Sequence, residues 1–173
     1  MAYLAFGCRC LLLAVFAFSA WGKLRDAAAF RVATAQLVPA ARRYATPLAV
    51  VVVAAELAAV VLLAALPPAG LGIGLALLVA FTAAIAAALR RGGSAPCRCF
   101  GASTRPLGAR HLVRNAFLLL VTTTGLVATS FEPVGSEPAG FAMAVATAAV
   151  LTALVLSFDA LADLFTHLER TTT

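Results

Sequence analysis

Charged side chains are scarce in this chain: they make up 12% of its 173 residues, while 63% of the residues are hydrophobic. A soluble domain of this size is about half apolar and about a quarter charged. The mean hydropathy is +1.01, and the apolar residues come in long blocks rather than in a helical or alternating pattern. This composition excludes a soluble globular domain and predicts an integral membrane protein, whose partner is a lipid bilayer.

Basic stripes interleaved with aromatic residues are also missing, and this excludes nucleic-acid binding despite a net charge of +6. The basic residues cluster instead at the ends of apolar blocks, where membrane anchoring and orientation explain them. Internal repeats are absent as well. The excess of positive charge is therefore interpreted as a membrane-orientation signal.

Five apolar segments are each long enough to cross the hydrocarbon core, which takes about 20 helical residues. The predicted spans cover about residues 3–22, 48–66, 69–89, 112–131 and 140–160. We expect an all-α membrane protein with a four-helix transmembrane core over residues 1–131. Residues 132–173 add a connecting loop, a fifth C-terminal span and a polar tail. The first segment is read as a span and not as a signal peptide, because no basic region precedes its apolar run.

The segment between the first two spans is too polar to cross a membrane. Its apolar residues give one side to a short helix: Phe30, Val32, Ala33, Leu37 and Val38. Such a pattern predicts an interfacial helix after the first span, and Pro39 is expected to break it.

Cysteine is rare, with four residues, and it occurs as two C-x-C pairs. Cys97 and Cys99 lie in the loop "RRGGSAPCRCFGAS", between the third and fourth spans. Arg98 between them favours the thiolate and so raises reactivity, and a disulfide in so small a ring should be strained and labile. Two unpaired cysteines are one alternative. A metal site is another, although His111 is the only nearby imidazole that could add a ligand.

Cys8 and Cys10 differ from the loop pair because they fall inside a predicted helix. Residues two apart on a helix point about 200° away from each other, so these thiols cannot pair without unwinding the helix. Cysteine is also an ordinary small buried residue. We therefore expect packing for Cys8 and Cys10, and treat them as secondary thiols only.

Ionisable groups inside predicted spans are functional candidates by default. Glu56 lies within the second span, and Arg114 and Asn115 begin the fourth. Arg114 is expected to pair with Glu56, to order the cysteine loop, or to reach the membrane interface.

With five spans, the N-terminus and the "LPPAG" turn fall on one side of the membrane, here called face A. The segment Lys23–Tyr44, the cysteine loop and the C-terminus fall on the other side, face B. Of the 13 Lys and Arg residues, all but Arg9 lie at face B. The positive-inside rule makes face B cytoplasmic.

Several of these segments resemble one family. "FSAWGKLRDAAAFRVATAQLVP", "AAELAAVVLL" and "CRCFGAS" followed by "HLVRNAFLLL" are similar to the MauE branch of the DoxX-like membrane proteins, over about residues 10 to 128. The resemblance implies a four-helix membrane core and a role in thiol–disulfide chemistry, alongside methylamine dehydrogenase maturation or other secreted proteins. Thioredoxin-like partners often accompany the family.

The resemblance also implies site residues and, more remotely, a cofactor. Cys97 and Cys99 would be the redox pair, and the remaining matches to recurrent positions are Glu56, Lys23, Arg114 and Asn115. The fold resembles vitamin K epoxide reductase-like enzymes, which pass electrons between loop thiols and a quinone. That cofactor rests on analogy alone, because no quinone motif is visible in the sequence.

The hypothesis that follows is a membrane thiol–disulfide oxidoreductase, or a redox accessory protein, of the plasma membrane. Two alternatives are a non-enzymatic membrane scaffold or assembly factor, and a Cu(I)- or Zn(II)-handling membrane protein. Oxidative chemistry requires the cysteine loop outside the cytoplasm, whereas the arginine distribution argues for the cytoplasmic side. We expect the extracytoplasmic side.

Overall fold

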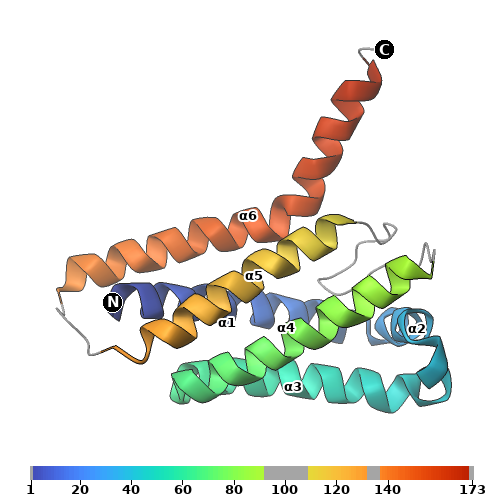
Figure 1. Ribbon diagram of the computed structural model, residues 1–173, viewed down its shortest axis with the longest axis horizontal. Coiled ribbons are helices and arrows are strands. Elements are labelled where there is room, and N and C mark those ends of the chain that lie inside the picture. The colour runs from blue at the N-terminus through green and yellow to red at the C-terminus, as the bar shows by residue number, and fades with distance from the viewer. Residues whose placement is uncertain (1, 92–108, 132–136, 172–173) are drawn as a thin grey trace.

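The computed structural model describes residues 2–91, 109–131 and 137–171, and within them the side chains of residues 40, 41, 109 and 158–171 are not described. Helices are the only regular secondary structure in these ranges (Figure 1). They are α1 (Ala2–Arg25), α2 (Ala27–Leu37), the 3-10 helix η1 (Pro39–Tyr44), α3 (Ala45–Ala65), α4 (Pro67–Arg90), α5 (Ala109–Ala128) and α6 (Pro138–Thr171).

Five helices are long and apolar enough to cross a membrane, which confirms the all-α membrane fold. Their candidate spans are Ala2–Arg25, Arg42–Ala65, Pro67–Arg90, Arg110–Ala128 and Pro138–Ser157. Most bounds lie within three residues of those predicted from the sequence. The second span is the most displaced, because it begins at Arg42, six residues before the predicted start.

The interfacial segment folds as its apolar pattern predicts. The carboxylate of Asp26 accepts a hydrogen bond from the backbone N–H of Ala29 at 3.1 Å and caps the start of α2. This is the ordinary way to satisfy an orphan donor in the first turn. Phe30 and Ala33 are buried, whereas Val32 is exposed. The helix ends at Leu37, and η1 begins at Pro39, where the break was expected.

The tight turn between α3 and α4 is made by Leu66 and the two prolines that follow it. Pro67 suits the first position of α4 because its missing N–H would have no partner there. Past the turn, Gly70 is pressed against α3, and a Cβ atom built on it would lie 2.6 Å from the Cα atom of Leu63. The two helices therefore approach closely only because residue 70 is glycine, a common device in membrane helix packing.

Helix α1 occupies the middle of the bundle and contacts α3, α4, α5 and α6. Helices α3, α4 and α5 form a layer in which each packs on the next, and α6 lies along α1 (Figure 1). The main core is built around α1 from the buried side chains Leu11, Leu12, Val15, Phe16, Ala59, Leu63, Leu71, Leu78, Leu118, Ala148 and Val155. Since Ala148 and Val155 belong to α6, the fifth span shares one core with the first four.

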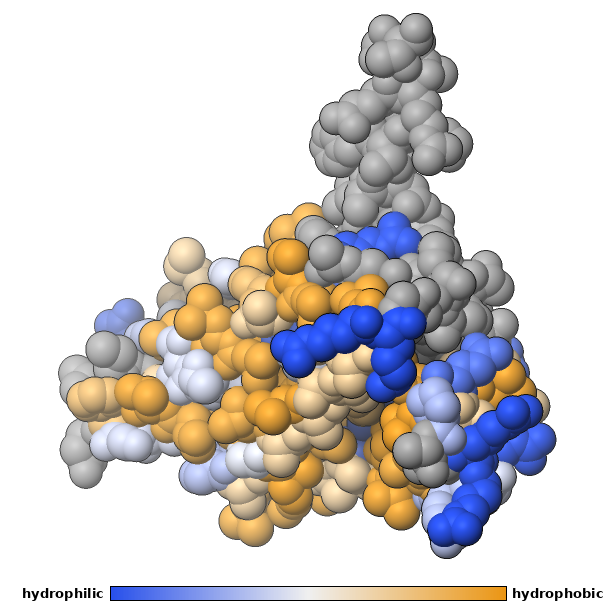
Figure 2. Space-filling view, turned by 45° about the vertical axis from the view of Figure 1, so that its right-hand side comes forward, coloured by the Kyte–Doolittle hydropathy of each residue, from blue (hydrophilic) through white to orange (hydrophobic). Residues whose placement is uncertain are grey.

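Hydrophilic residues gather at one end of the molecule. Figure 2 shows them mainly at the end that carries α2, while hydrophobic side chains cover much of the rest of the visible bundle. The exposed cations of this end include Arg25, Arg31, Arg42 and Arg43. This end corresponds to face B.

Candidate functional site

A buried ion pair links α1 to α3 near face B. The Nζ atom of Lys23 lies 2.5 Å from Oε1 of Glu56, and both side chains are fully buried. Lys23 also donates to the hydroxyl of Ser19 at 2.6 Å, and Ser19 donates to the same Oε1 atom at 2.9 Å. Ser19, Lys23 and Glu56, here called the polar triad, form a closed triangle of hydrogen bonds.

The sequence allows this triangle because of helical spacing. Ser19 and Lys23 are four residues apart, so they lie on the same face of α1 one turn from each other. Glu56 lies among the buried positions of α3, together with Ala49, Ala59 and Leu63. That face of α3 packs on α1, and the carboxylate is therefore directed into the bundle rather than into lipid.

Two aromatic rings surround the ammonium group of Lys23. The ring centres of Phe30 on α2 and Phe81 on α4 each lie 5.3 Å from Nζ. A desolvated cation–π contact contributes about 2 kcal/mol, and these contacts offset part of the cost of removing the lysine from water. Four helices therefore enclose the triad. Helix α1 carries the lysine, α2 and α4 supply the rings beside its ammonium group, and α3 carries the carboxylate.

The carboxylate of Glu56 retains one oxygen without a partner. Its Oε2 atom is buried and accepts no hydrogen bond from the residues that the structure describes. An unsatisfied carboxylate oxygen in a water-poor interior is costly, and such groups mark proton or ligand sites in membrane proteins more often than purely structural ones. The triad thus brings a hydroxyl, an ammonium group and a carboxylate within hydrogen-bonding distance of one another.

Arg114 is not the partner of Glu56, although pairing between them was one of the roles expected for it. The arginine is buried near the start of α5, next to the buried Asn115. Among the described residues, the side chains that donate hydrogen bonds to Glu56 are Lys23 and Ser19. The other two expected roles of Arg114, ordering the cysteine loop and reaching the interface, remain predictions.

Asn115 connects α5 to the surroundings of the triad. Its side-chain amide donates to the hydroxyl of Thr82 at 3.4 Å, and Thr82 follows Phe81, whose ring contacts Lys23. The Oδ1 atom of Asn115 is buried without a partner among the described residues. Of the residues predicted from the sequence, Lys23, Glu56 and Asn115 are thus brought into one neighbourhood.

Sequence reasoning missed Ser19, Phe30 and Phe81 as members of this site. It named Lys23 as a site residue only through the family resemblance, and from the residues alone it treated Lys23 as a marker of face B. A signal for Ser19 was present in the sequence, since a serine and a lysine at i and i+4 share one helix face. The roles of the phenylalanines had no such signal, because phenylalanine in an apolar span or on an interfacial helix usually means core or lipid contact.

Cys97, Arg98 and Cys99 lie outside the described residues. The described helices do fix where their segment begins and ends. Helix α4 ends at Arg90 and α5 begins at Ala109, and both of these ends lie at the end of the bundle that carries α2 (Figure 1). The guanidinium of Arg91 donates to the carbonyl of Leu37 at 2.7 Å and ties this point to α2.

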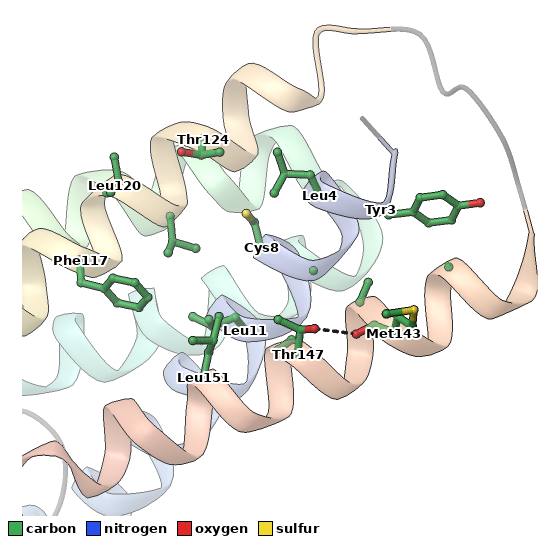
Figure 3. Close-up of a pocket in the computed structure, with 15 residues that line it drawn as sticks. Tyr3, Leu4, Cys8, Leu11, Phe117, Leu120, Thr124, Met143, Thr147 and Leu151 are labelled. Atoms are coloured by element: carbon green, nitrogen blue, oxygen red, sulfur yellow. Dashed lines mark hydrogen bonds between the residues drawn. The ribbon is translucent and has the colours of Figure 1, made fainter. Parts of the chain in front are cut away.

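Cys8 and Cys10 are free thiols on the continuous helix α1, as their helical position predicted. Cys8 is buried, and its Cβ atom lies close to Gly125 on α5, where an added Cβ would approach it to 2.9 Å. Figure 3 shows its sulfur at a groove lined by α1, α5 and α6, with a volume of about 580 Å³. Cys10 lines a different groove, between α1 and α6.

No group of three or more His, Cys, Asp or Glu side chains in the described ranges is arranged to hold a metal ion. His111 is buried near the start of α5. The metal alternative depends on Cys97 and Cys99, so it is not tested by these ranges.

Comparison with known proteins gives one result. The family model of the methylamine utilisation protein MauE matches residues 1–129, which include α1 to α5 and the polar triad. Neither the curated proteins nor the solved structures contain a significant match. Because the matched region covers most of the chain, this multi-pass membrane protein belongs to the methylamine utilisation protein MauE family.

Proposed function

We propose that this protein carries out thiol–disulfide exchange at the membrane surface, with Cys97 and Cys99 as its reactive pair. The observation that carries the proposal is the position of the segment that contains them. This segment leaves α4 and enters α5 at the end of the bundle where the polar triad is buried. The two helices that bound it also supply Phe81, Thr82 and Asn115 to the surroundings of that triad.

The proposed reaction passes a disulfide between the loop and a thioredoxin-like partner or a secreted client. In the oxidising direction, the thiolate of a reduced client attacks a sulfur of the Cys97–Cys99 disulfide and forms a mixed disulfide. A second client thiolate then breaks that bond, so the client leaves oxidised and the loop is left as a dithiol. Two electrons pass from client to loop, and the two protons released by the client thiols are taken up by the loop cysteines.

The loop must then be reoxidised by a second disulfide, which we assign to the thioredoxin-like partner. Arg98, between the cysteines, favours the thiolate form that attacks this partner. A quinone enters only by analogy with vitamin K epoxide reductase-like enzymes, and no step is routed through one. The polar triad is proposed to position the helices that carry the loop and to exchange protons with its surroundings.

We further propose that the protein lies in the plasma membrane with the cysteine loop outside the cytoplasm. Disulfides persist in oxidising compartments and are rapidly reduced in the cytosol, so exchange with secreted clients requires this orientation. The arginines at face B favour the opposite orientation.

Thiol labelling in intact cells tests both orientation and redox state. Cells expressing a Cys8→Ser/Cys10→Ser variant are treated with a membrane-impermeant maleimide, with and without prior reduction. We expect labelling of two cysteines only after reduction. Labelling that requires cell lysis would overturn the proposed orientation. A pair that is always reduced would overturn the exchange function.

A functional readout separates exchange from scaffolding. Cys97→Ser and Cys99→Ser are each expected to abolish client oxidation. On non-reducing gels, the variant that keeps the cysteine bonded to the client should accumulate a mixed disulfide, and the other variant should form none. Full retention of client maturation by the double serine variant would favour the scaffold alternative instead. Loss of bound copper or zinc from that variant would favour the metal-handling alternative.

A further inference from the structure

A third groove lies on the outside of the bundle and is lined by residues of α1, α2 and α3. Its volume is about 460 Å³, within the range of pockets that hold small molecules. Buried Lys23, Phe30 and Ala49 contribute to its lining. Apolar side chains of α3 line the rest of its length, namely Val50, Val53, Ala54 and Leu57.

The dimensions of this groove match one leaflet of a bilayer. Its lining on α3 runs from Thr46 to Leu57, and eleven residues of helix rise about 16 Å. Half of the hydrocarbon core is about 15 Å thick. A single extended acyl chain entering from the interface at face B would therefore lie along α3 within its own leaflet.

The polar lining of the groove is cationic. Arg31 on α2 contributes a guanidinium, whereas Lys23 on α1 also lines the groove but is paired with Glu56. Among the described residues that line the groove, none is acidic. Arg31 is exposed and makes no hydrogen bond or ion pair with another residue in the described parts of the chain. Thr46 adds an exposed hydroxyl at the end where α3 begins. An acidic headgroup thus finds a guanidinium and a hydroxyl at the interfacial end of an apolar channel.

The position of α2 indicates that the acidic headgroup is the phosphate of a membrane lipid. This short helix is amphipathic and follows directly on a span, so it lies at the boundary between headgroups and acyl chains. Two further cations, Arg25 and Arg42, are exposed at the same end and raise the local concentration of anionic lipid. Guanidinium groups bind phosphate oxygens in bidentate geometry.

We propose that this groove is a binding site for one anionic phospholipid, with its phosphate on Arg31 and one acyl chain along Val50, Val53 and Leu57. The site is independent of the proposed thiol chemistry. The bound lipid would contact both α2 and α3 beside the polar triad, so its binding would change the surroundings of Lys23.

Native mass spectrometry of the detergent-purified protein tests the proposal directly. The probes are phosphatidylglycerol, phosphatidylcholine and palmitate, each added at increasing concentration. We expect one phosphatidylglycerol to bind tightly. Arg31→Gln should weaken its binding about tenfold or more, since a hydrogen-bonded charged contact contributes about 1.5–3 kcal/mol. Arg31→Lys should fall between the two proteins. Arg43→Gln is the matched control, because Arg43 is stacked on Tyr44, 4.7 Å from its ring centre, and does not line the groove.

A second measurement blocks the apolar channel and leaves Arg31, the proposed phosphate ligand, unchanged. Val53→Trp should fill the groove and reduce phosphatidylglycerol binding, whereas Val61→Trp, at an exposed position on α3 outside the groove, should not. Circular dichroism and gel filtration establish that each variant is folded. Equal phosphatidylglycerol binding by the wild-type protein and the folded Arg31→Gln variant would overturn the proposal. So would preference for palmitate, or a dimer mass that disappears in Val53→Trp, which would assign the groove to a second copy.

Discussion

Lys23 and Glu56 lie 33 residues apart in the sequence, and their side chains meet at 2.5 Å inside the membrane-spanning bundle. The contact joins the first span to the second at a point where neither side chain reaches the surface. Neutralising one member leaves the other as an uncompensated charge in a medium of low dielectric constant. The two residues should therefore behave as a unit.

A double-mutant cycle measures this coupling. Lys23→Met and Glu56→Gln should each lower the free energy of unfolding by about 3 kcal/mol, the lower end of the cost of breaking a buried pair. The double variant should lose clearly less than the sum, because no isolated charge remains. Unfolding of the purified protein in mixed micelles with increasing SDS gives the values. Additive losses would show that the two side chains act separately.

The close approach of α3 and α4 should depend on a single glycine. Gly70→Ala places a methyl group against the backbone of Leu63 and should cost about 1–3 kcal/mol through overpacking. Gly72→Ala is the matched control on the same helix, because nothing lies within 4 Å of the added carbon. It should be neutral or stabilise the helix by up to about 1 kcal/mol. Thermal unfolding in detergent compares the two, and equal effects would contradict the packing argument.

Cys8 and Cys10 should not form a disulfide with each other. Both lie on an unbroken helix and contribute to different grooves. In a Cys97→Ser/Cys99→Ser background, treatment with a thiol oxidant should leave both thiols open to later alkylation, seen as two mass additions after denaturation. A protected pair in the monomer would show that α1 unwinds at this point. Replacing both with serine should leave disulfide exchange intact.

Helix α6 should be needed for the stability of the helices that match the family. A chain ending at residue 131 loses Ala148 and Val155 from the core around α1, and we expect its unfolding temperature to fall by about 10 °C, as a loss of about 3 kcal/mol would give. A chain ending at Ser157 keeps these residues and serves as the control. If the two truncated proteins melt together, α6 is an addition and not part of the core.

Much of this fold could be predicted from the sequence, because lipid imposes a simple rule on it. Backbone groups must be satisfied within each span, so apolar blocks become helices; the turn at Leu66 and the break before Pro39 follow from proline chemistry. The interfacial helix was predicted from its one-sided apolar pattern, although Val32 faces outward and not into the bundle.

The arrangement of the site could not be predicted with the same success. Glu56 and Lys23 were identified as single residues, but their pairing depends on which faces of α1 and α3 meet, and uniformly apolar spans carry little information on their rotation. A lysine at a span end ordinarily extends to the interface, so counting charges gave no hint that Lys23 turns inward. The small residues that decide helix packing, such as Gly70 and Gly125, look alike in the sequence whether they are buried or not.

The central position of α1 has a consequence for biogenesis. Among the five candidate spans α1 is synthesised first, and it contacts all four of the later ones, α6 most extensively. The carboxylate that pairs with its Lys23 is supplied by α3, the next span. During translation, the ion pair between Lys23 and Glu56 can therefore form only after α3 has been synthesised. The core around α1 is completed only when α6 has been synthesised, because α6 supplies Ala148 and Val155 to it.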